Sequence, residues 1–517
     1  MGGEQVSTED ATNRTNLTKL SEELSGKHVT VAGLGVSGMP AAKVLHRLGA
    51  RVTAVNGGDG EGPRRQAAEL EALGIGVRLG DDRTLPEGTE LIVTTPGFKP
   101  TSPLFQAAAE AGVPVWGDVE LAWRLRGPEA PPWLAVTGTN GKTTTVQMLA
   151  CILRAAGLRT AAVGNIGVSL IDVVLEQEPY DGLDVLAVEL SSYQLHWAPS
   201  LRPHSGAVLN LAPDHLDWHG SMEAYAAAKG RIYEGNQVAC VYNADDRGCE
   251  PGVPRTEDLV RAADVVEGAR AIGFTLGTPA PSQLGVVEGV LVDRAFVADR
   301  QQQAQELAET GDITPAAPHN IANALAAAAL ARAFGVPPVA VRDGLRAFSP
   351  DAHRITHVAE VGGVSYVDDS KATNTHAAEA SLAAYESIVW IAGGLAKGAT
   401  FDELVAASAP RLRGVVLMGA DRELIRQALA RHAPQVPVAD LDRTDTGAMA
   451  EAVREATSLA RPGDTVLLAP ACASMDMFVN YNARGDAFAE AVRALAADGP
   501  HSGRAGHSEP AEGNSEH

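Results

Sequence analysis

Cysteine is scarce in this chain of 517 residues. The four cysteines, Cys151, Cys240, Cys249 and Cys472, lie far apart in the sequence, and no CxxC pair occurs. This pattern argues against a disulfide framework or a zinc ribbon, and it predicts a reducing, cytoplasmic setting. The N-terminus has no basic segment followed by an apolar run, so we expect no signal peptide.

The sequence also lacks a long apolar run and a surplus of basic residues. No strongly apolar stretch approaches the roughly 20 residues that a membrane-spanning helix needs. Asp and Glu number 64 against 42 Lys and Arg, which gives a net charge of −22. Because nucleic-acid binders carry a basic footprint, this balance argues against nucleic acid as a partner. It does not argue against small anionic ligands, since these respond to local charge.

The chain does contain enough apolar material for several cores. A single core stops growing near about 250–300 residues, so the length predicts two to four domains. Hydrophobic residues make up 45% and charged residues 21%, which is an ordinary globular composition. The two polar ends, residues 1–24 and 499–517, are predicted to be disordered because they hold almost nothing that a core could bury.

Between these ends, three segments each begin with an apolar strand and continue with alternating strands and helices. This alternation predicts an α/β fold of parallel sheets wrapped by helices. We expect an N-terminal Rossmann-like domain over residues 25–115, a central P-loop ATPase-like domain over 116–350 and a C-terminal Rossmann-like domain over 351–498. Residues from about 251 to 318 are rich in Gly and Pro and predict a small accessory sheet in the central domain.

The most specific local motif is the segment GTNGKTT at residues 138–144, which follows a predicted strand and opens a helix. Such a loop directs backbone N–H groups at phosphate, at the positive end of the helix dipole. Lys142 is expected to reach the β- and γ-phosphates of a nucleotide, and Thr143 to bind Mg²⁺. Val136 stands where the general P-loop pattern has glycine. The alternative is a glycine-rich turn that binds nothing.

A second glycine-rich turn, GLGVSG at residues 33–38, follows the first predicted strand. A nicotinamide site would add an acidic residue at the end of the next strand, where this chain has Asn56. The sequence therefore disfavours a nicotinamide dehydrogenase. A different diphosphate-bearing ligand, or a turn that only packs a helix on a strand, stays open.

A carboxylate and an imidazole follow two further predicted strands. Glu189 ends the strand at 185–188, and His215 lies just past the strand at 206–209. Ligands of open α/β sheets bind at the carboxyl ends of the strands, so both residues fall on the edge that carries the P-loop. One oxygen and one nitrogen ligand suit a second Mg²⁺ or Mn²⁺. Taken singly, each residue is more often a surface or packing residue.

The remaining polar segments are ambiguous from their pattern alone. Lys229 has the pattern of a solvated helix lysine. In the third segment, the turns at 367–374, 393–397 and 470–476 follow strands and are rich in small polar residues, which suit either anionic ligands or ordinary caps. Cys472 is interpreted as a small buried thiol, since no paired base accompanies it.

Together these motifs resemble the Mur ligases over roughly residues 27–495. The marks shared with the wider family are GTNGKTT at 138–144, GNIG at 164–167, the strand end at Glu189, DHLD at 214–217, AK at 228–229 and HNIAN at 319–323. DSKATN at 369–374 and PACAS at 470–474 resemble the members that add D-glutamate.

The resemblance implies an ATP-dependent acid–amino-acid ligase of peptidoglycan precursor synthesis. ATP is expected to phosphorylate the free carboxylate of UDP-N-acetylmuramoyl-L-alanine, and the amine of D-glutamate to attack the resulting acyl phosphate. ADP and phosphate are the other products. These three small molecules are the expected partners, with no nucleic acid and no membrane span, and the chain is expected to be a monomer.

The resemblance also implies the ATP and metal contacts. The residues expected to bind ATP are Gly138, Thr139, Asn140, Gly141, Lys142, Thr143, Thr144, Asn320, Asn323, Arg354 and Asp369. The residues expected to hold two Mg²⁺ ions, or Mn²⁺, are Thr143, Glu189, His215 and Lys229, the last as a carbamate formed with CO₂. The expected catalytic residues are Lys142, Glu189, His215, Lys229 and Lys371.

Contacts with the other two substrates follow from the same resemblance. The residues expected to bind the UDP substrate are Val36, Ser37, Gly38, Asn56, Asn165 and His215. The residues expected around D-glutamate, besides Lys371, are Thr373, Lys397, Ser474, Met475 and Tyr481. Asn56 departs from the acidic residue common in relatives, and Tyr481 replaces a familiar Phe. The stretch 230–318 is interpreted as an insertion in the accessory sheet.

Two other function classes stay open at this stage. A sister ligase would add L-alanine, a diamino acid or a glutamate on folate, and the DSKATN and PACAS segments argue against it. A P-loop protein could instead bind nucleotide as a switch without catalysis. The presence of Glu189, His215, Lys229 and the lysines of the third segment argues against a switch, which needs no amino-acid site.

Overall fold

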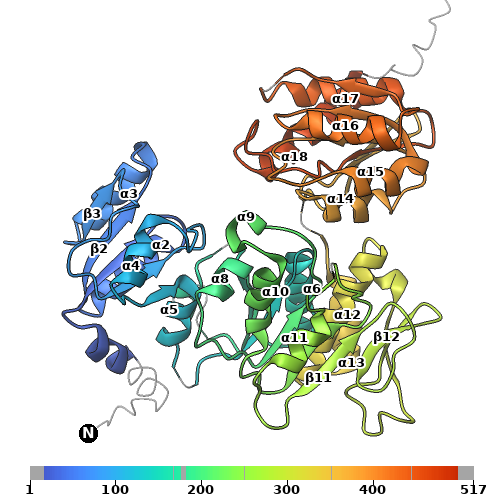
Figure 1. Ribbon diagram of the computed structural model, residues 1–517. Helices are drawn as coiled ribbons and strands as arrows, with labels where there is room; N and C mark the ends of the chain where they lie inside the picture. Colours follow the sequence, from blue (N-terminus) through green and yellow to red (C-terminus); the bar gives the residue numbers. More distant parts are fainter. Residues whose placement is uncertain are drawn as a thin grey trace, which may run out of the picture. The chain divides into compact units, whose positions relative to one another are not determined.

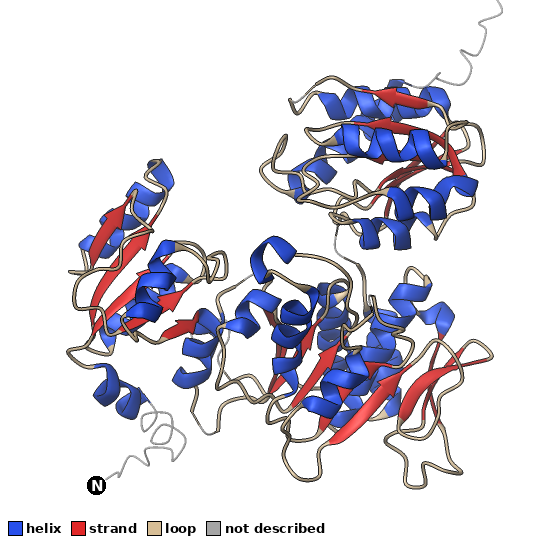
Figure 2. Ribbon diagram, in the orientation of Figure 1, coloured by secondary structure: helices blue, strands red, loops and turns tan. Residues whose placement is uncertain are grey.

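The computed structural model describes residues 17–127, 129–166, 168–175, 182–249, 251–350, 352–443 and 445–498. The chain divides into two compact units, Met1–Ser349 and Pro350–His517. The described residues hold three sheets, each wrapped by helices (Figures 1 and 2). The predicted α/β class, with mostly parallel sheets in three regions, is confirmed. The division between the units lies one residue from the boundary expected at 350.

The first sheet has five parallel strands in the order β3-β2-β1-β4-β5. The strands are β1 (His28–Ala32), β2 (Arg51–Asn56), β3 (Gly76–Leu79), β4 (Leu91–Thr94) and β5 (Val115–Gly117). The helices are α2 (Gly38–Arg47), α3 (Glu61–Glu71), α4 (Pro103–Glu110) and α5 (Asp118–Leu125). The strand order reverses at β1, so the loop after β1 lies at the switch point where such sheets bind ligands. Since β5 pairs with β4, this domain extends past the boundary expected at residue 115.

The second sheet has nine strands in the order β14-β13-β12-β11-β10-β9-β6-β8-β7. The strands are β6 (Trp133–Thr137), β7 (Thr160–Gly164), β8 (Val185–Glu189), β9 (Ser205–Val208), β10 (Ala239–Asn243), β11 (Arg270–Phe274), β12 (Gln283–Val287), β13 (Val290–Asp293) and β14 (Gln305–Glu309). The accessory strands β12, β13 and β14 pair in antiparallel fashion and continue the edge of this sheet. β6 lies between β8 and β9, which places its carboxyl end beside theirs.

Helices cover both faces of the second sheet. They are α6 (Lys142–Ala155), α7 (Leu170–Val174), α8 (Ser192–His196), α9 (Leu216–His219), α10 (Met222–Gly230), α11 (Thr256–Ala262), α12 (Pro318–Ala333) and α13 (Pro338–Ala347), with 3₁₀ turns η1 (Arg231–Tyr233) and η2 (Thr310–Asp312). The alanines of α12 are buried from residue 324 to 331. Their small side chains let α12 approach α6, which carries the start of the phosphate loop.

The packing of α13 on α6 yields a stability prediction at Gly344. Gly→Ala in a helix normally stabilises it by up to about 1 kcal/mol. A Cβ on Gly344, however, would lie 2.6 Å from the backbone N of Ile152 and 2.9 Å from the carbonyl carbon of Cys151. We expect Gly344→Ala to lower the free energy of unfolding by about 1–3 kcal/mol, measured by thermal and denaturant unfolding. Gly62→Ala in α3 is the control, because a Cβ there has no neighbour within 4 Å; equal stability of the two variants would contradict this account.

The second unit contains a six-stranded sheet in the order β15-β16-β20-β17-β18-β19. Its strands are β15 (Thr356–Val361), β16 (Val364–Asp368), β17 (Ile388–Ala392), β18 (Leu412–Leu417), β19 (Val438–Asp440) and β20 (Thr465–Leu468). Its helices are α14 (Thr375–Leu382), α15 (Asp402–Ser408), α16 (Arg422–His432), α17 (Ala448–Leu459) and α18 (Tyr481–Asp498), with the 3₁₀ turn η3 (Ala409–Arg411). β15 and β16 form an antiparallel hairpin, and the other pairs are parallel.

The N-terminal prediction is wrong for one segment. Residues 17–24 were expected to be disordered, yet they are helical, and Leu20 and Leu24 are buried in the first core. These leucines are four residues apart and therefore lie on the same face of the helix, which buries them together. The other residues of the predicted disordered ends, 1–16 and 499–517, lie outside the described residues. Among the described helices, none has the length and apolar character to cross a bilayer.

Candidate active site

The phosphate loop lies at the carboxyl end of β6 and leads directly into α6. Gly138 and Gly141 have φ values of 155° and 82°, which side-chain-bearing residues rarely adopt. A Cβ on Gly141 would also collide with the side chain of Asn323. The loop therefore depends on these two glycines for its shape, and α6 begins at Lys142 with its N-terminal N–H groups toward the loop.

Lys142 folds back over the loop that precedes it. Its Nζ donates hydrogen bonds to the carbonyl oxygens of Gly138 (2.9 Å) and Thr139 (2.8 Å). The loop is fixed from the other side, because Asn140 N donates to Asn210 Oδ1 (2.9 Å). This arrangement keeps a positive charge beside backbone N–H groups at a helix N-terminus, which is the chemistry that binds phosphate.

Glu189 is a buried carboxylate at the end of β8, with 2% of its surface exposed. It accepts hydrogen bonds from Thr143 Oγ1 (2.6 Å) and from Asn165 Nδ2 (3.0 Å). The structure thus brings together the predicted metal residues Thr143 and Glu189. It places Asn165, predicted to contact the UDP substrate, directly on the same carboxylate.

Lys229 of α10 lies inside the protein, only 1% exposed, and not on the surface as its pattern alone indicated. Its Nζ donates to Gly138 O (2.8 Å) and lies 4.5 Å from the centre of the Tyr225 ring. Burial is the main cause that holds the pKa of Lys229 well below its ordinary value, and the charge of Lys142 lowers that pKa further. The charges of Asp214 and Glu189 raise it in part. The predicted residues Lys142, Glu189 and Lys229 therefore share one electrostatic environment.

His215 lies in the loop after β9 with a left-handed backbone, φ 57°. Its Nδ1 is 3.5 Å from Asp214 Oδ1, and its ring packs 4.8 Å from that of Tyr193. The indole of Trp218 anchors this loop by donating to Phe98 O (3.1 Å). His215 is thus held at the same edge of the sheet as Glu189, where the carboxyl ends of β8 and β9 lie.

The residues of this edge fit a hard divalent cation. No group of three or more His, Cys, Asp or Glu side chains in the described parts of the chain could hold a metal by itself. Mg²⁺, however, takes one or two protein oxygens and completes its octahedron with water and phosphate oxygens. The Thr143 hydroxyl and the Glu189 carboxylate, which already lie within 2.6 Å of each other, are such donors.

Asn320 and Asn323 lie near the start of α12, both 6% exposed. Asn323 Nδ2 donates to Asn320 Oδ1 (3.3 Å), and Asn320 Nδ2 donates to Pro315 O (3.3 Å). The close approach of Asn323 to Gly141 places this pair beside the phosphate loop. The predicted nucleotide residues of the first unit are therefore brought together by the packing of α12 on α6.

The glycine-rich loop after β1 is fixed by Asn56. Asn56 Oδ1 accepts from Leu34 N (3.3 Å), and its Nδ2 donates to Gly58 O (2.8 Å). An ionised aspartate could accept the first bond but could not donate the second. Of the other predicted residues, Val36 is 73% exposed, whereas Ser37 is almost buried. This loop and Asn56 therefore form one cluster at the switch point of the first sheet.

In the second unit, the predicted residues gather at the carboxyl ends of β16, β17 and β20. Lys371 Nζ lies 3.9 Å from the centre of the Tyr481 ring, and Thr373 N donates to Lys371 O (2.8 Å). Leu395 and Ala473 exchange two backbone hydrogen bonds of 2.9 Å, which joins the turn of Lys397 to the segment of Ser474 and Met475.

Two further predicted residues, Arg354 and Asp369, interact in the same unit. Asp369 is buried, and burial raises its pKa to about 6; a hydrogen bond from Ser381 and the charge of Arg354 oppose that rise. These groups therefore form a mixed polar cluster at the end of β16, where the DSKATN segment begins.

Comparison with known proteins decides the family. The Mur ligase middle domain matches residues 136–331, and the Mur ligase glutamate ligase domain matches residues 353–472. The chain is 79% identical to the UDP-N-acetylmuramoylalanine–D-glutamate ligase of Streptomyces coelicolor, covering 92% of this chain and 100% of that relative. It is 59% identical to the ligase of the same name from Thermobifida fusca, covering 92% and 100%.

The chain belongs to the Mur ligase family. The family predicted from the motifs is thereby confirmed. Solved structures share the fold: a UDP-N-acetylmuramate-alanine ligase from Thermotoga maritima has a TM-score of 0.52 at 17% identity, covering 91% of this chain and 99% of that one. A pseudomurein peptide ligase type C from Methanothermus fervidus has a TM-score of 0.54 at 17% identity, covering 91% and 100%.

Sequence reasoning missed one buried residue of this Mur ligase, Arg484 of α18. Its guanidinium donates to Ser370 Oγ (3.0 Å), Ser370 O (2.8 Å) and Cys472 O (3.1 Å). Burial lowers the pKa of Arg484 to about 10. Arg484 thus fastens the two segments that mark D-glutamate-adding members, DSKATN and PACAS, to one helix. Arginine is rarely buried, so its position in the sequence carries no signal of this role.

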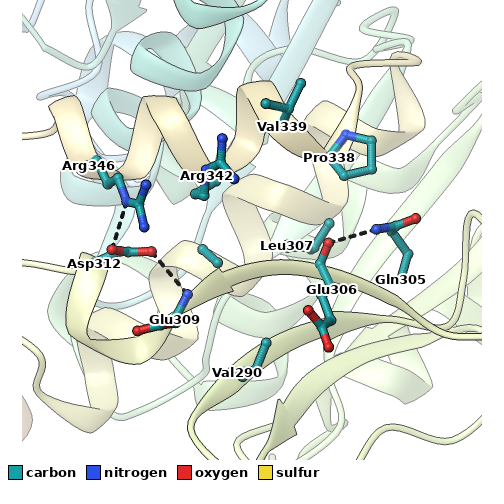
Figure 3. A pocket seen from close by; sticks show the side chains of 11 residues that line it. Val290, Gln305, Glu306, Leu307, Glu309, Asp312, Pro338, Val339, Arg342 and Arg346 are labelled. Atoms are coloured by element: carbon teal, nitrogen blue, oxygen red, sulfur yellow. Dashed lines mark hydrogen bonds and ion pairs between the residues drawn. The ribbon is translucent and has the colours of Figure 1, made fainter.

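A hollow of about 560 Å³ lies elsewhere in the Mur ligase, between β14 and α13 (Figure 3). Leu307, Val339 and Arg342 are among the residues that line it, and Arg346 closes one side by pairing with Asp312 (2.8 Å). The lining contains none of the predicted site residues. The candidate site is therefore the strand-end edge around β6, β8 and β9, and this hollow is separate from it.

Proposed function

We propose that this Mur ligase joins D-glutamate to the alanine carboxylate of UDP-N-acetylmuramoyl-L-alanine, using ATP, as a step of peptidoglycan precursor synthesis. The observation that carries the proposal is the cluster of Lys142, Thr143, Glu189 and buried Lys229 around one phosphate loop. The ligases of that name at 79% and 59% identity support the choice of substrates.

In the first step, a carboxylate oxygen of the UDP substrate attacks the γ-phosphorus of ATP, and the bond to the bridging oxygen breaks to release ADP. Negative charge on the transferring group must be stabilised, and here the loop N–H groups and Lys142 would do so. Lys142 must then exchange the carbonyls of Gly138 and Thr139 for phosphate oxygens. Asn320 and Asn323 would bind the adenine.

Thr143 would hold one Mg²⁺, and Glu189 and His215 would hold a second, supported by Lys229 as a carbamate. The cation, when bound, neutralises charge on the phosphates. Carbamate formation needs the neutral amine, whose nitrogen bonds to the carbon of CO₂ while a proton leaves. The lowered pKa of Lys229 makes that neutral form available inside the protein. An anion placed near Glu189 and Asp214 would in turn require a cation among them.

In the second step, the amine of D-glutamate attacks the acyl phosphate carbonyl, a C–N bond forms, the amine loses a proton and phosphate leaves. Lys371 and Lys397 would face the two carboxylates of D-glutamate, together with Thr373, Ser474, Tyr481 and the backbone of Met475. We propose that the first unit comprises a UDP-binding domain and an ATP-binding domain, and that the second binds D-glutamate. We also propose that the enzyme is a monomer and acts in the cytoplasm.

A substrate panel tests the proposal. The full chain is incubated with ATP, Mg²⁺ and UDP-N-acetylmuramoyl-L-alanine, and phosphate release is measured with D-glutamate, L-glutamate, L-alanine or a diamino acid supplied separately. We expect release with D-glutamate only, because the second-unit cluster carries the segments of D-glutamate-adding members. Release with a different amino acid would indicate a sister ligase. Nucleotide binding without release would indicate a switch protein.

A further inference from the structure

The segment between β4 and α4, residues 95–102, contacts elements of two different sheets, and we call it the β4 loop. On the side of the first sheet, Thr95 N donates to Ala32 O (3.0 Å) at the end of β1. A Cβ on Gly33 would lie 3.1 Å from Cε2 of the Phe98 ring, and Gly33 has φ 95°, so this position requires glycine. The β4 loop therefore packs directly on the glycine-rich loop to which the UDP end of the substrate is assigned.

The β4 loop is also bonded to α9, which belongs with the second sheet. Trp218 Nε1 donates to Phe98 O (3.1 Å), and Lys99 Nζ donates to Asp217 Oδ2 (2.8 Å) and to Asp217 O (3.0 Å). Two consecutive residues of the β4 loop thus bind two consecutive residues of α9 through three hydrogen bonds. These three loop–helix bonds join residues that lie 118 and 120 positions apart in the chain.

The helix that the β4 loop binds also carries the backbone of His215. His215 is the N-cap of α9, and its carbonyl oxygen accepts from Trp218 N (3.0 Å) and from His219 N (3.1 Å). On its other side, α9 is bonded to α8, because His219 Nε2 and Ser192 Oγ form a hydrogen bond of 2.9 Å. Ser192 lies three residues after Glu189. The three loop–helix bonds therefore connect the β4 loop to the segments that place both candidate metal residues.

The three loop–helix bonds differ in what they contribute to the fold. Trp218 is 6% exposed, and its ring centre lies 4.7 Å from that of Tyr193, so Trp218 fixes α9 against the interior. The side chains of Lys99 and Asp217 are 45% and 60% exposed. An exposed ion pair contributes little to the stability of the whole fold. Lys99 can therefore set the separation of two segments without deciding whether the chain folds.

We propose that Lys99 and Trp218 are positioning residues that hold the glycine-rich loop at a fixed separation from His215. This inference rests on the proposed function, in which the UDP end of the substrate binds the glycine-rich loop and the alanine carboxylate reacts beside Glu189 and His215. One substrate molecule must then contact both elements at once. Because positioning carries much of catalysis, a displacement of about 1 Å can cost on the order of 100-fold in rate.

Exchange of the two charges tests the role of Lys99. Lys99→Glu places two carboxylates side by side, and Asp217→Lys places two ammonium groups side by side, so each single variant should push the β4 loop and α9 apart. We expect each to raise the KM for UDP-N-acetylmuramoyl-L-alanine about tenfold and to lower kcat, with the KM for D-glutamate unchanged. The double variant restores an ion pair but not the bond to Asp217 O. We expect its KM to lie within about threefold of wild type; a double variant no better than the worse single one overturns the proposal.

Calorimetric binding separates positioning from damage to the glycine-rich loop. UDP alone reaches only that loop, whereas UDP-N-acetylmuramoyl-L-alanine reaches both elements. We expect Lys99→Glu to lower the affinity for the whole substrate about tenfold and to leave the affinity for UDP unchanged. Trp218→Phe keeps a ring against Tyr193 but removes the N–H donor to Phe98 O, so it should show the same pattern with a loss of about threefold. Equal losses for UDP and for the whole substrate, or no loss in either variant, overturn the proposal.

Lys43→Glu is the matched control. Lys43 is 41% exposed and pairs with Glu69 (2.5 Å) between α2 and α3, so this charge reversal leaves the β4 loop in place and should keep the wild-type KM. Thermal melting reports folding; if Lys99→Glu does not fold, Lys99→Met removes the bonds to Asp217 without adding a charge and must raise the same KM about threefold. A wild-type chain that binds the substrate yet releases no phosphate with D-glutamate overturns the proposed function alone, because the affinities still test Lys99 and Trp218.

Discussion

Lys229→Ala is expected to lower the rate of D-glutamate-dependent phosphate release on the order of 1000-fold. The buried amine lies against Gly138 O, and its charge environment includes Glu189, Asp214 and Lys142. Loss of a carbamate at this position would remove an anion that supports the metal site. Short carboxylic acids fit the space left by the side chain and supply an anion. Adding them should raise the rate of the Lys229→Ala variant about tenfold over its rate without acid.

A second variant separates chemistry from packing at this position. Lys229→Met fills most of the same volume without a nitrogen, so it should fold, lack activity and resist rescue by acids. Lys43→Ala is a surface control, since Lys43 of α2 pairs with Glu69 of α3 at the protein surface. The assay is the initial rate against acid concentration for each variant. Wild-type rates in Lys229→Ala, or equal rescue of the methionine variant, would rule out a carbamate.

Lys142→Ala is expected to lower kcat about 100- to 1000-fold while leaving UDP-substrate binding unchanged. Lys142 is the cation of the phosphate loop, and its Nζ donates hydrogen bonds to the Gly138 and Thr139 carbonyls. Its loss removes charge stabilisation when phosphoryl transfer begins, but it leaves the glycine-rich loop of the first sheet intact. The kcat for phosphate release and the calorimetric affinity for UDP-N-acetylmuramoyl-L-alanine measure the two effects separately.

The matched variant for this prediction is Lys142→Arg, which keeps the charge but is larger and planar. It should remain strongly impaired, because the lysine fits between two carbonyls of a tight loop and arginine does not share that geometry. Thermal melting should show both variants folded. A rate near wild type in Lys142→Ala would contradict the assignment of the phosphate loop.

Local motifs were predictable where the chemistry lies in contiguous residues. GTNGKTT follows a strand and opens a helix, so its sequence alone indicated a phosphate site, and the structure has that loop with φ values that need Gly138 and Gly141. Glu189 was expected at a strand end because parallel strands present their carboxyl ends on one edge. Its hydrogen bond with Thr143 follows from that shared edge.

Other features depended on contacts between distant segments. Lys229 lies in an alanine-rich stretch whose pattern indicates a surface helix, and its burial follows from the packing of α10 on α8 and α11. Residues 17–24 are polar on average, but Leu20 and Leu24 meet an apolar core supplied by later strands. Arg484 finds two of its acceptors 114 residues upstream, at Ser370.

The sequence by itself determined the α/β class, the family and the chemical groups available: a phosphate loop, a strand-end carboxylate, a histidine and several lysines. These follow from local periodicity and from residues that act within a few positions of one another. Only the tertiary structure decided that Lys229 is buried beside Gly138 and that Asn165 bonds to Glu189. The physical reason is that burial, and the pKa shifts and hydrogen bonds it imposes, come from segments that meet only when the helices pack onto their sheets.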